Sequence, residues 1–394
     1  MIFCGSYLNS QSGTGGFAPV AYWLNETGTL TPDMNHSRRI RALRRSMNDH
    51  GVQALIVTHL PDVRYLCGFT GSNAVLCVSA TRAALFTDGR YIVQAKEQTQ
   101  SARVVISEKS ALGDACIWLE KCGAKRVAFD PDHVSVATLA RMRESIDRRR
   151  KNFFLPLEMA LVSELRQVKD DDELAIMSKA AQLGCELFED ILPKIESGTT
   201  EISVAAQLEF AARSRGAEGM SFETIVASGP RSAMPHGHAG PSRLPRNGFV
   251  TLDFGVILDG YCSDMTRTVH LGKLSREERF AYEAVLEAQL AGVEAVRPGA
   301  TCGEVDEAAR GVLRRAKLDE YFTHSTGHGV GIEIHEPPRI AREQETVLVP
   351  GMVVTIEPGI YVAGKFGIRI EDMVVVTDRA QRVLTPAPKV LIEL

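Results

Sequence analysis

Two aspartates, Asp253 and Asp264, lie on either side of the dipeptide Asp259-Gly260 in the otherwise apolar run LDFGVILDGYCSDMTRT. An Asp-Gly pair between two such runs is typical of the two-residue turn of a β-hairpin. Carboxylates that converge on a half-buried sheet face repel each other and lose hydration, so they need a counter-charge, and a metal ion is the natural one. The spacing therefore predicts a metal-binding hairpin; a pair of solvated strand aspartates is the alternative.

The predicted turn also fixes the register of the hairpin. With Asp259-Gly260 as its two-residue loop, Asp253 lies opposite Thr266. Because side chains alternate between the two faces of a sheet, Asp253 and Asp264 are expected on one face as diagonal neighbours, ~7–8 Å apart at the backbone. Phe254 and Met265 then point to the opposite, buried face.

Later segments add histidine, glutamate and arginine side chains: His324, His328 and His335 in FTHSTGHGVGIEIHE, Glu357 in VVTIEPGIYV, and Arg369 and Glu371 in GIRIEDMVVV. Arg369 and Glu371 are expected on one face of a single strand, since they are two residues apart. The spacing of His324 and His328 matches a helical zinc motif, but Ser325 replaces its glutamate and the neighbouring glycines disfavour a helix.

The chemistry of this set is that of a dinuclear metal centre. Four carboxylates and one imidazole would balance the charge of two divalent cations and leave room for a bound hydroxide. Hard oxygen ligands with a single nitrogen suit Mn²⁺, and Co²⁺, Zn²⁺ or Fe²⁺ would also be accepted.

The elements that must position these residues belong to the second of two expected domains, since 394 residues are long for one. Residues 158–394 are predicted to form it, with a helix beginning at Asp170–Asp172 and others at about 203–215, 275–296 and 303–317. The strand-rich pieces between and after these helices carry nearly all the unusual polar residues.

A smaller α/β domain is predicted for residues 37–157. Its first helix should run from a Ser37 cap to Gly51, with Ile40, Leu43 and Met47 on the buried face. Strand-like and helical runs then alternate, namely QALIVTH, AVLCVSA and RAALFTD as strands and DACIWLEKCG and VATLARMRESIDRRR as helices.

The first 36 residues are rich in Gly, Ser, Thr and Asn and are expected to be a disordered extension, with Met34 as an alternative start of translation. No run reaches the ~20 apolar residues of a membrane span. The net charge of −4 and a single short basic run, Arg148–Lys151, argue against nucleic-acid binding. Eight scattered cysteines without a Cys-x-x-Cys pair predict a reducing, cytoplasmic location.

With these residues the chain resembles a known family, the M24 metallopeptidases of pita-bread fold, and most closely the short bacterial Xaa-Pro aminopeptidases and Xaa-Pro dipeptidases (prolidases). Five motifs carry the resemblance in the family's order: SFETIVASGPRSAMPHG, VTLDFGVILDGYCSDMTRTV, HSTGHGVGIEIHE, VPGMVVTIEPGIYV and GIRIED. The resemblance extends from about Ser37 to the end. It implies an α+β, creatinase/aminopeptidase-like catalytic domain and a smaller α/β creatinase-like amino-terminal domain.

The resemblance also implies residue roles. Two divalent metal ions would be held by Asp253, Asp264, His328, Glu357 and Glu371, with Asp264 and Glu371 bridging both ions. The implied catalytic residues are His236, His324, His335, Glu357 and Arg369, and the implied substrate-binding residues are His236, His324, His335 and Tyr361. Arg369 is expected to orient Glu371, its neighbour at a spacing of two. His238 departs from the pattern of relatives and is expected to be a surface substitution.

The implied reaction is hydrolysis of an Xaa-Pro bond by a hydroxide that bridges the two metal ions. Glu357 would accept the proton and relay it to the leaving imino nitrogen. His324 and His335 would donate hydrogen bonds to the substrate carbonyl and the oxyanion, and His236 would hold the proline side.

The expected activity is removal of the residue that precedes a proline from the amino terminus of a peptide, and the alternative is a dipeptidase that splits only Xaa-Pro dipeptides. Methionine aminopeptidase, metal-independent creatinase and a non-catalytic peptide-binding protein are further rivals. Hydrolysis of Met-Gly-Xaa peptides, turnover that survives chelation, or a metal-loaded but inert protein would favour these in turn. The expected partners are a proline-containing peptide and a second copy in a homodimer, without nucleic acid or membrane.

Overall fold

The computed structural model describes residues 22–24, 30–32, 34–147, 149–150 and 152–394. Residues 1–33 and 34–394 form two separate units. In the first unit, β1 (Tyr22–Leu24) pairs antiparallel with β2 (Leu30–Pro32). Most of the extension expected over residues 1–36 lies outside the described residues, and the first helix begins inside that range, at His36.

A mixed six-stranded sheet lies at the centre of the amino-terminal part of the second unit, in the order β6-β5-β4-β3-β7-β8. Its strands are β3 (Ala54–Val57), β4 (Val75–Ser79), β5 (Ala83–Asp88), β6 (Arg103–Ser107), β7 (Val127–Phe129) and β8 (Phe154–Pro156). Its helices are α1 (His36–Asp49), α2 (Leu60–Cys67), α3 (Ile92–Gln98), α4 (Ala111–Lys121) and α5 (Val136–Glu144). The predicted strands and helices of this region are therefore present.

Both faces of this sheet are buried. In β3, Leu55 and Val57 join the hydrophobic cluster that contains α1 and α2, whereas Ala54 and Ile56 join the cluster that contains α4. Alternate residues of a strand enter different cores only when both faces are covered. The arrangement is that of the predicted α/β domain.

The amino-terminal end of α1 differs from the prediction. Its cap is Asn35, whose side chain accepts a hydrogen bond from the Arg38 backbone N–H, and Ser37 lies within the helix. Asparagine caps as well as serine does, so Asn35 can begin the helix two residues before the predicted cap. Ile40, Leu43 and Met47 are buried, as their spacing predicts.

The carboxy-terminal part contains four smaller sheets, ordered β10-β11-β14, β13-β12-β9, β16-β15-β17-β20-β21 and β18-β19. The strands are β9 (Gly219–Met220), β10 (Ile225–Ser228), β11 (Gly248–Phe254), β12 (Val256–Leu258), β13 (Tyr261–Cys262), β14 (Met265–Leu271), β15 (Gly327–Gly329), β16 (Glu336–Ile340), β17 (Val353–Ile356), β18 (Gly359–Val362), β19 (Phe366–Arg369), β20 (Asp372–Val376) and β21 (Gln381–Val383). All described pairings within these sheets are antiparallel.

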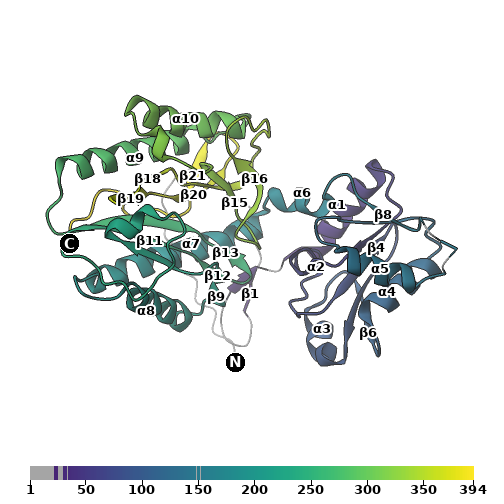
Figure 1. Cartoon of the computed structure of the whole chain (residues 1–394). Helices are drawn as coiled ribbons and strands as arrows, with labels where there is room; N and C mark the ends of the chain where they lie inside the picture. Colours follow the sequence, from purple (N-terminus) through teal and green to yellow (C-terminus); the bar gives the residue numbers. More distant parts are fainter. Residues whose placement is uncertain (1–21, 25–29, 33, 148, 151) are drawn as a thin grey trace, which may run out of the picture. The chain divides into compact units, whose positions relative to one another are not determined.

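Two helix pairs cover these sheets. The first pair follows the short helix α6 (Leu161–Gln167) and consists of α7 (Asp171–Ile191) and α8 (Glu201–Ser214), which pack on β9, β10, β12 and β13. The second pair consists of α9 (Arg276–Ala295) and α10 (Cys302–Arg315), which pack on β16, β17, β19 and β21. Figure 1 shows α9 and α10 on one side of the strands and α8 on the other. Capping boxes begin α7, α9 and α10, so local sequence sets where these helices start.

The strand expected over residues 367–376 is broken. β19 ends at Arg369 and β20 begins at Asp372, and the two strands belong to different sheets. Glu371 lies between them, where its backbone N–H donates to the Thr266 carbonyl 3.1 Å away. The hydrophobic pattern on both sides of the break is continuous, so the sequence alone gives no signal for it.

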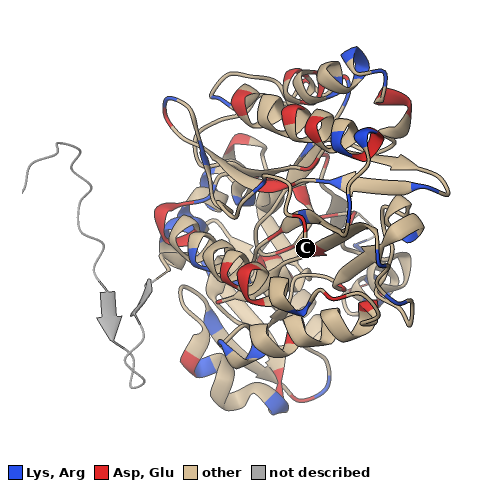
Figure 2. Ribbon diagram, turned by 90° about the vertical axis from the view of Figure 1, so that its left-hand side faces the viewer, with Lys and Arg blue, Asp and Glu red and all other residues tan. Residues whose placement is uncertain are grey.

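Acidic and basic residues are interspersed along the helices in the view of Figure 2 rather than gathered by sign. Among the described residues, no helix is both long enough and apolar enough to cross a membrane. Both observations agree with the composition of the chain.

Candidate metal centre and active-site pocket

The hairpin that carries the two aspartates has the predicted register. Asp253 in β11 lies opposite Thr266 in β14, and beyond them Leu258 pairs with Tyr261 across the turn. Asp259 and Gly260 have φ angles of 45° and 76°, so both turn residues are left-handed, as a type I′ turn requires. Asp253 and Asp264 line one cavity.

The opposite face of this hairpin is buried, as predicted. Phe254 and Met265 are 0% and 1% exposed and belong to the core under α7 and α8. Gly255 separates β11 from β12, where a Cβ atom would lie 1.7 Å from the Ser263 carbonyl oxygen. The two sides of the hairpin, at Gly255 and Ser263, approach too closely here for any side chain at residue 255.

The cavity has a volume of about 610 Å³, in the range of small-ligand sites. Nine of the ten residues expected at the site line it, namely His236, Asp253, Asp264, His324, His328, His335, Glu357, Arg369 and Glu371. Tyr361 does not: it is buried behind the wall, where its hydroxyl contacts His324 and Arg369. In this arrangement Tyr361 is therefore not placed to contact a substrate directly.

Three of the expected ligands converge closely. One ligand atom each from Asp264, His328 and Glu371 lies within 4.8 Å of the other two. His328 Nε2 is 3.6 Å from Asp264 Oδ2 and 3.6 Å from Glu357 Oε1. His328 Nδ1 is 3.0 Å from the Gly329 carbonyl oxygen, which directs the Nε2 lone pair of the neutral ring towards the carboxylates.

The electrostatics of the cavity fit divalent cations. Burial, together with the negative charges of neighbouring carboxylates, raises the pKa values of Asp264 and Glu357 well above their usual range. The same causes raise the pKa of Glu371 to about 8. The buried Asp253 Oδ1 has no hydrogen-bond partner among the described residues. Four carboxylates line this wall together with the cations Arg369 and Arg339, so two divalent ions would leave an excess of positive charge, which an anionic nucleophile would offset.

Arg369 does not pair with Glu371 as expected. Its Nη2 donates to Asp253 Oδ2, while its Nε donates to Thr266 Oγ1 at 3.2 Å. Thr266 in turn donates to Glu371 Oε2 at 2.7 Å. Residues 370–371 lie between β19 and β20, so Arg369 and Glu371 do not lie on one face of a single strand. The hydrogen bonds connect Arg369 with Glu371 through Thr266.

His324 donates one hydrogen bond, through Nδ1, and accepts one, through Nε2. Its Nδ1 is 2.7 Å from the Ser325 carbonyl oxygen and donates to it, so Nε2 is the acceptor. The Tyr361 hydroxyl, 2.9 Å away, donates to that Nε2 and itself accepts from Arg369 Nη1 at 2.7 Å. Burial, with the Arg369 charge, lowers the pKa of His324 to about 4. A donor role for His324 towards substrate stays a prediction, and it would require this chain of bonds to change.

The other three histidines are more open. His335 is exposed to the cavity and its ring packs edge-on against His328 at 4.5 Å between centroids. His236 is also exposed in the cavity wall. His238 lies at the rim, where its Nδ1 is 3.2 Å from Glu223 Oε2, so the position is both on the surface and beside the pocket.

Two residues at the site were not expected from the sequence. Arg339, in β16, lines the cavity, and its side chain has no hydrogen bond or ion pair to any described residue. Thr266 connects Arg369 with Glu371. A spacing of two from Asp264 could have indicated Thr266, whereas the only sequence signal for Arg339 is its place four residues after His335.

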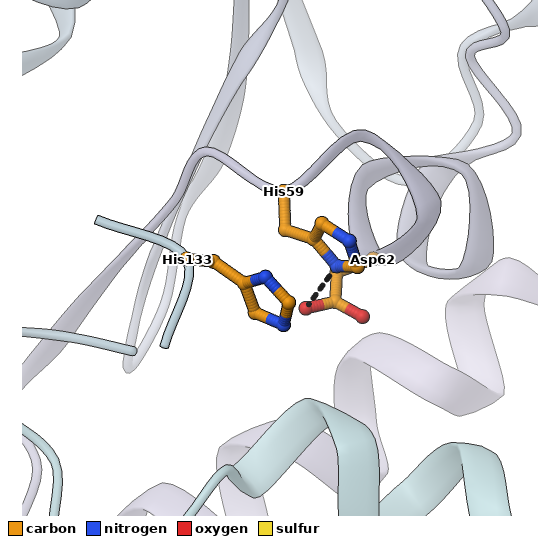
Figure 3. Close-up of side chains that lie close together, drawn as sticks. All are labelled: His59, Asp62 and His133. Atoms are coloured by element: carbon orange, nitrogen blue, oxygen red, sulfur yellow. Dashed lines mark ion pairs between the residues drawn. The ribbon is translucent and has the colours of Figure 1, made fainter. Parts of the chain in front are cut away.

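A second cluster of metal-type side chains lies in the amino-terminal domain, where ligand atoms of His59, Asp62 and His133 lie within 4.8 Å of one another (Figure 3). His59 Nδ1 is 3.3 Å from Asp62 Oδ2, an ion-pair distance without hydrogen-bond alignment, and Nε2 is 3.2 Å from Glu333 Oε1. The His59 and His133 rings stack at 3.6 Å, so their in-plane lone pairs do not converge. This geometry suits a protonated His59 rather than a metal ion.

Stability contributed by His59 should be lost as the pH rises. Burial alone would lower its pKa, but Asp62 and Glu333 outweigh burial and raise it from 6.5 to about 9. The contribution is fully present below pH 6.5 and disappears as the pH passes 9. We expect His59→Gln to have a lower Tm than the parent protein at pH 6 and a similar Tm at pH 10. A gap independent of pH would contradict this, and His133→Gln, which keeps both ion pairs, is the control.

Comparison with known proteins matches both parts of the chain. Residues 175–378 match the model of metallopeptidase family M24, and residues 39–168 match the creatinase/prolidase N-terminal domain. An Xaa-Pro dipeptidase of Pyrococcus horikoshii is 31% identical over 360 residues, 90% of this chain and 99% of that protein. Among solved structures, an Xaa-Pro dipeptidase from Bacillus anthracis aligns with a TM-score of 0.88 at 40% identity, covering 91% of this chain and 100% of that one.

An X-Pro aminopeptidase from Thermotoga maritima also aligns, with a TM-score of 0.83 at 33% identity, covering 90% of this chain and 99% of that chain. These matches confirm the fold predicted from the motifs, including the pita-bread catalytic domain. The domain limits expected at residues 37–157 and 158–394 remain predictions. The chain belongs to metallopeptidase family M24, with an amino-terminal domain of the creatinase/prolidase type.

Proposed function

We propose that this protein is a metal-dependent Xaa-Pro dipeptidase. The relatives named Xaa-Pro dipeptidase favour this activity over the aminopeptidase expected from the sequence, while the Thermotoga maritima match keeps the aminopeptidase as the rival. The observation that carries the proposal is Arg339, an unpaired guanidinium in the same cavity as the ligand cluster. In an Xaa-Pro dipeptide the proline bears a free carboxylate, whereas in a longer peptide an amide takes its place.

Arg339 is suited to bind that carboxylate. A guanidinium presents a planar fork of donors that matches a carboxylate in bidentate fashion. Arg369 is not available for this task, because Asp253, Tyr361 and Thr266 already occupy it. Recognition of the free carboxyl terminus would restrict the enzyme to dipeptides.

The proposed metal ligands are Asp253, Asp264, His328, Glu357 and Glu371. Divalent ions bound there would acidify a water molecule and polarise the scissile carbonyl. Mn²⁺ is the proposed ion, because the donor set is oxygen-rich with one nitrogen. A cytoplasmic homodimer is the proposed form of the enzyme.

The chain's own side chains supply the remaining functions. Glu357 would take a proton and pass it to the proline nitrogen, which needs one because the tertiary amide leaves as a secondary amine. His335 would donate to the oxyanion and His236 would contact the proline residue. Arg369 keeps Asp253 in place through their ion pair.

Arg339→Met should lower kcat/KM for Ala-Pro by ~10–100-fold, mainly through KM, since charge-assisted hydrogen bonds contribute roughly 1.5–3 kcal/mol. Hydrolysis of Ala-Pro-Ala should be slow in the parent enzyme and change little. Both peptides are assayed with metal-free enzyme refilled with manganese, zinc or cobalt. Arg342→Met, an exposed arginine outside the cavity, is the matched control. Faster hydrolysis of Ala-Pro-Ala than of Ala-Pro would instead establish an aminopeptidase.

A further inference from the structure

The segment that carries His335 is anchored by its neighbour Glu336. The Glu336 carboxylate is buried; its Oε1 accepts from Arg166 Nη2 and, at 3.1 Å, from the Glu333 backbone N–H, and its Oε2 is 3.3 Å from Lys169 Nζ. The side chains of Arg166 and Lys169 are only 5% and 1% exposed. Two buried cations therefore bind the carboxylate that follows His335.

Arg166 connects this anchor to the amino-terminal domain. Its Nη1 is 2.7 Å from Asp62 Oδ1 in α2, and its Nη2 is 2.8 Å from Glu333 Oε2. His59 contacts the other oxygen of Glu333, at 3.2 Å. The segment from Glu333 to Glu336 is thus bound on both sides of His335.

The charges in this network balance. Asp62, Glu333 and Glu336 supply three negative charges, and Arg166, Lys169 and protonated His59 supply three positive ones. A buried network that loses one charge leaves another without compensation, and the uncompensated group moves or draws in water. Removing a single cation should therefore displace Glu336.

His335 has no comparable restraint of its own. Among the described residues, its side chain has a ring contact with His328 but no hydrogen bond or ion pair. Its position consequently depends on the backbone of the turn, which Gly331 closes by donating to the Glu333 carbonyl at 3.1 Å. A Cβ atom at Gly331 would lie 2.5 Å from Glu336 Oε2, so the carboxylate fills the space inside this turn.

We propose that Arg166 and Lys169 are positioning residues for catalysis, which fix the place of the His335 imidazole in the active-site cavity by clamping Glu336. They do not touch the substrate. The proposal rests on the peptidase function proposed above. A transition-state donor that is misplaced by about 1 Å can cost ~10²-fold in rate, so the clamp acts on kcat more than on KM.

The test is a double-mutant cycle with His335→Ala, assayed on Ala-Pro with metal content measured for every variant. Lys169→Met and Glu336→Gln, which keep the side-chain size, should each lower kcat ~10–30-fold in the parent enzyme with little change in KM. In the His335→Ala background, the same changes should alter kcat less than about twofold, because their effect passes through His335. Equal fold-losses in both backgrounds would overturn the proposal.

A matched control and a structural readout separate positioning from general destabilisation. Arg39 forms ion pairs with Asp170 and Glu173 and, among the described residues, has no hydrogen bond or ion pair to residues 333–336, so Arg39→Met should lower Tm while kcat stays within about twofold. A crystal structure of Lys169→Met should show the His335 ring displaced relative to His328, and an unmoved ring would also overturn the proposal. Absence of Ala-Pro hydrolysis by the parent enzyme would instead contradict the proposed dipeptidase function. The crystal structure of Lys169→Met would still test whether the contacts of Glu336 position His335.

Discussion

Asp264→Ala should abolish peptide hydrolysis and metal loading together. Asp264 is close to both His328 and Glu371, and all three can offer an atom to one ion. As a proposed bridging ligand it serves both metal positions, so its loss should leave less than ~10⁻³ of the parent kcat/KM, because acidification of water from a pKa of 15.7 towards ~7 depends on the ions. Metal content after dialysis, together with Ala-Pro hydrolysis, checks this.

Two comparisons sharpen the experiment. Asp259→Asn removes a carboxylate from the exposed turn of the same hairpin, where Asn accepts the left-handed backbone, and should leave activity and metal content unchanged. The isosteric Asp264→Asn should raise the Tm of metal-free protein, since it relieves repulsion among the four carboxylates that line the cavity, and should remove the Tm increase on metal addition. Retained turnover with full metal content would remove the dinuclear hypothesis.

His335→Ala should lower kcat by ~10²–10³-fold while metal content stays intact. His335 is exposed to the cavity beside His328 but is not one of the three residues whose ligand atoms converge. Burial, with the influence of His236, lowers its pKa, so at neutral pH it would donate as a neutral imidazole to the oxyanion. Loss of one such donor where water is excluded costs about 2.7–4 kcal/mol.

The control for His335 is the histidine at the cavity rim. His238→Ala removes an exposed imidazole paired with Glu223 and should change kcat by less than about threefold. If His335→Ala instead released metal in proportion to lost activity, His335 would be a ligand. Comparable losses in both variants would point to a general effect of imidazole in the pocket rather than to a specific donor.

The comparisons change the support for the alternative functions that the sequence left open. The chain matches both the M24 model and the creatinase/prolidase N-terminal domain, so membership of the family no longer depends on motifs alone. The choice between dipeptidase and aminopeptidase depends on what the pocket does with the residue after proline. Under the proposed function, Arg339 would bind the free carboxylate of the dipeptide, so its substitution tests this choice.

Local chemistry determined a large part of this molecule. Asp259-Gly260 demands a tight turn, and strict alternation along the flanking strands then places Asp253 and Asp264 on one face and Phe254 and Met265 on the other. Capping boxes likewise set the starts of α7, α9 and α10. These features involve residues a few positions apart, so the sequence contains everything needed to predict them.

Other features depended on segments that are distant in the sequence. Arg369 pairs with Asp253, 116 residues away, instead of Glu371, and Tyr361 lies behind the cavity wall because it fills the space between Arg369 and His324. The break before β20, the open guanidinium of Arg339 and the clamp on Glu336 arise in the same way. Residue types and the motifs shared with the family named the expected ligands, but hydrogen-bond partners and exposure are properties of packing, which only the tertiary structure decides.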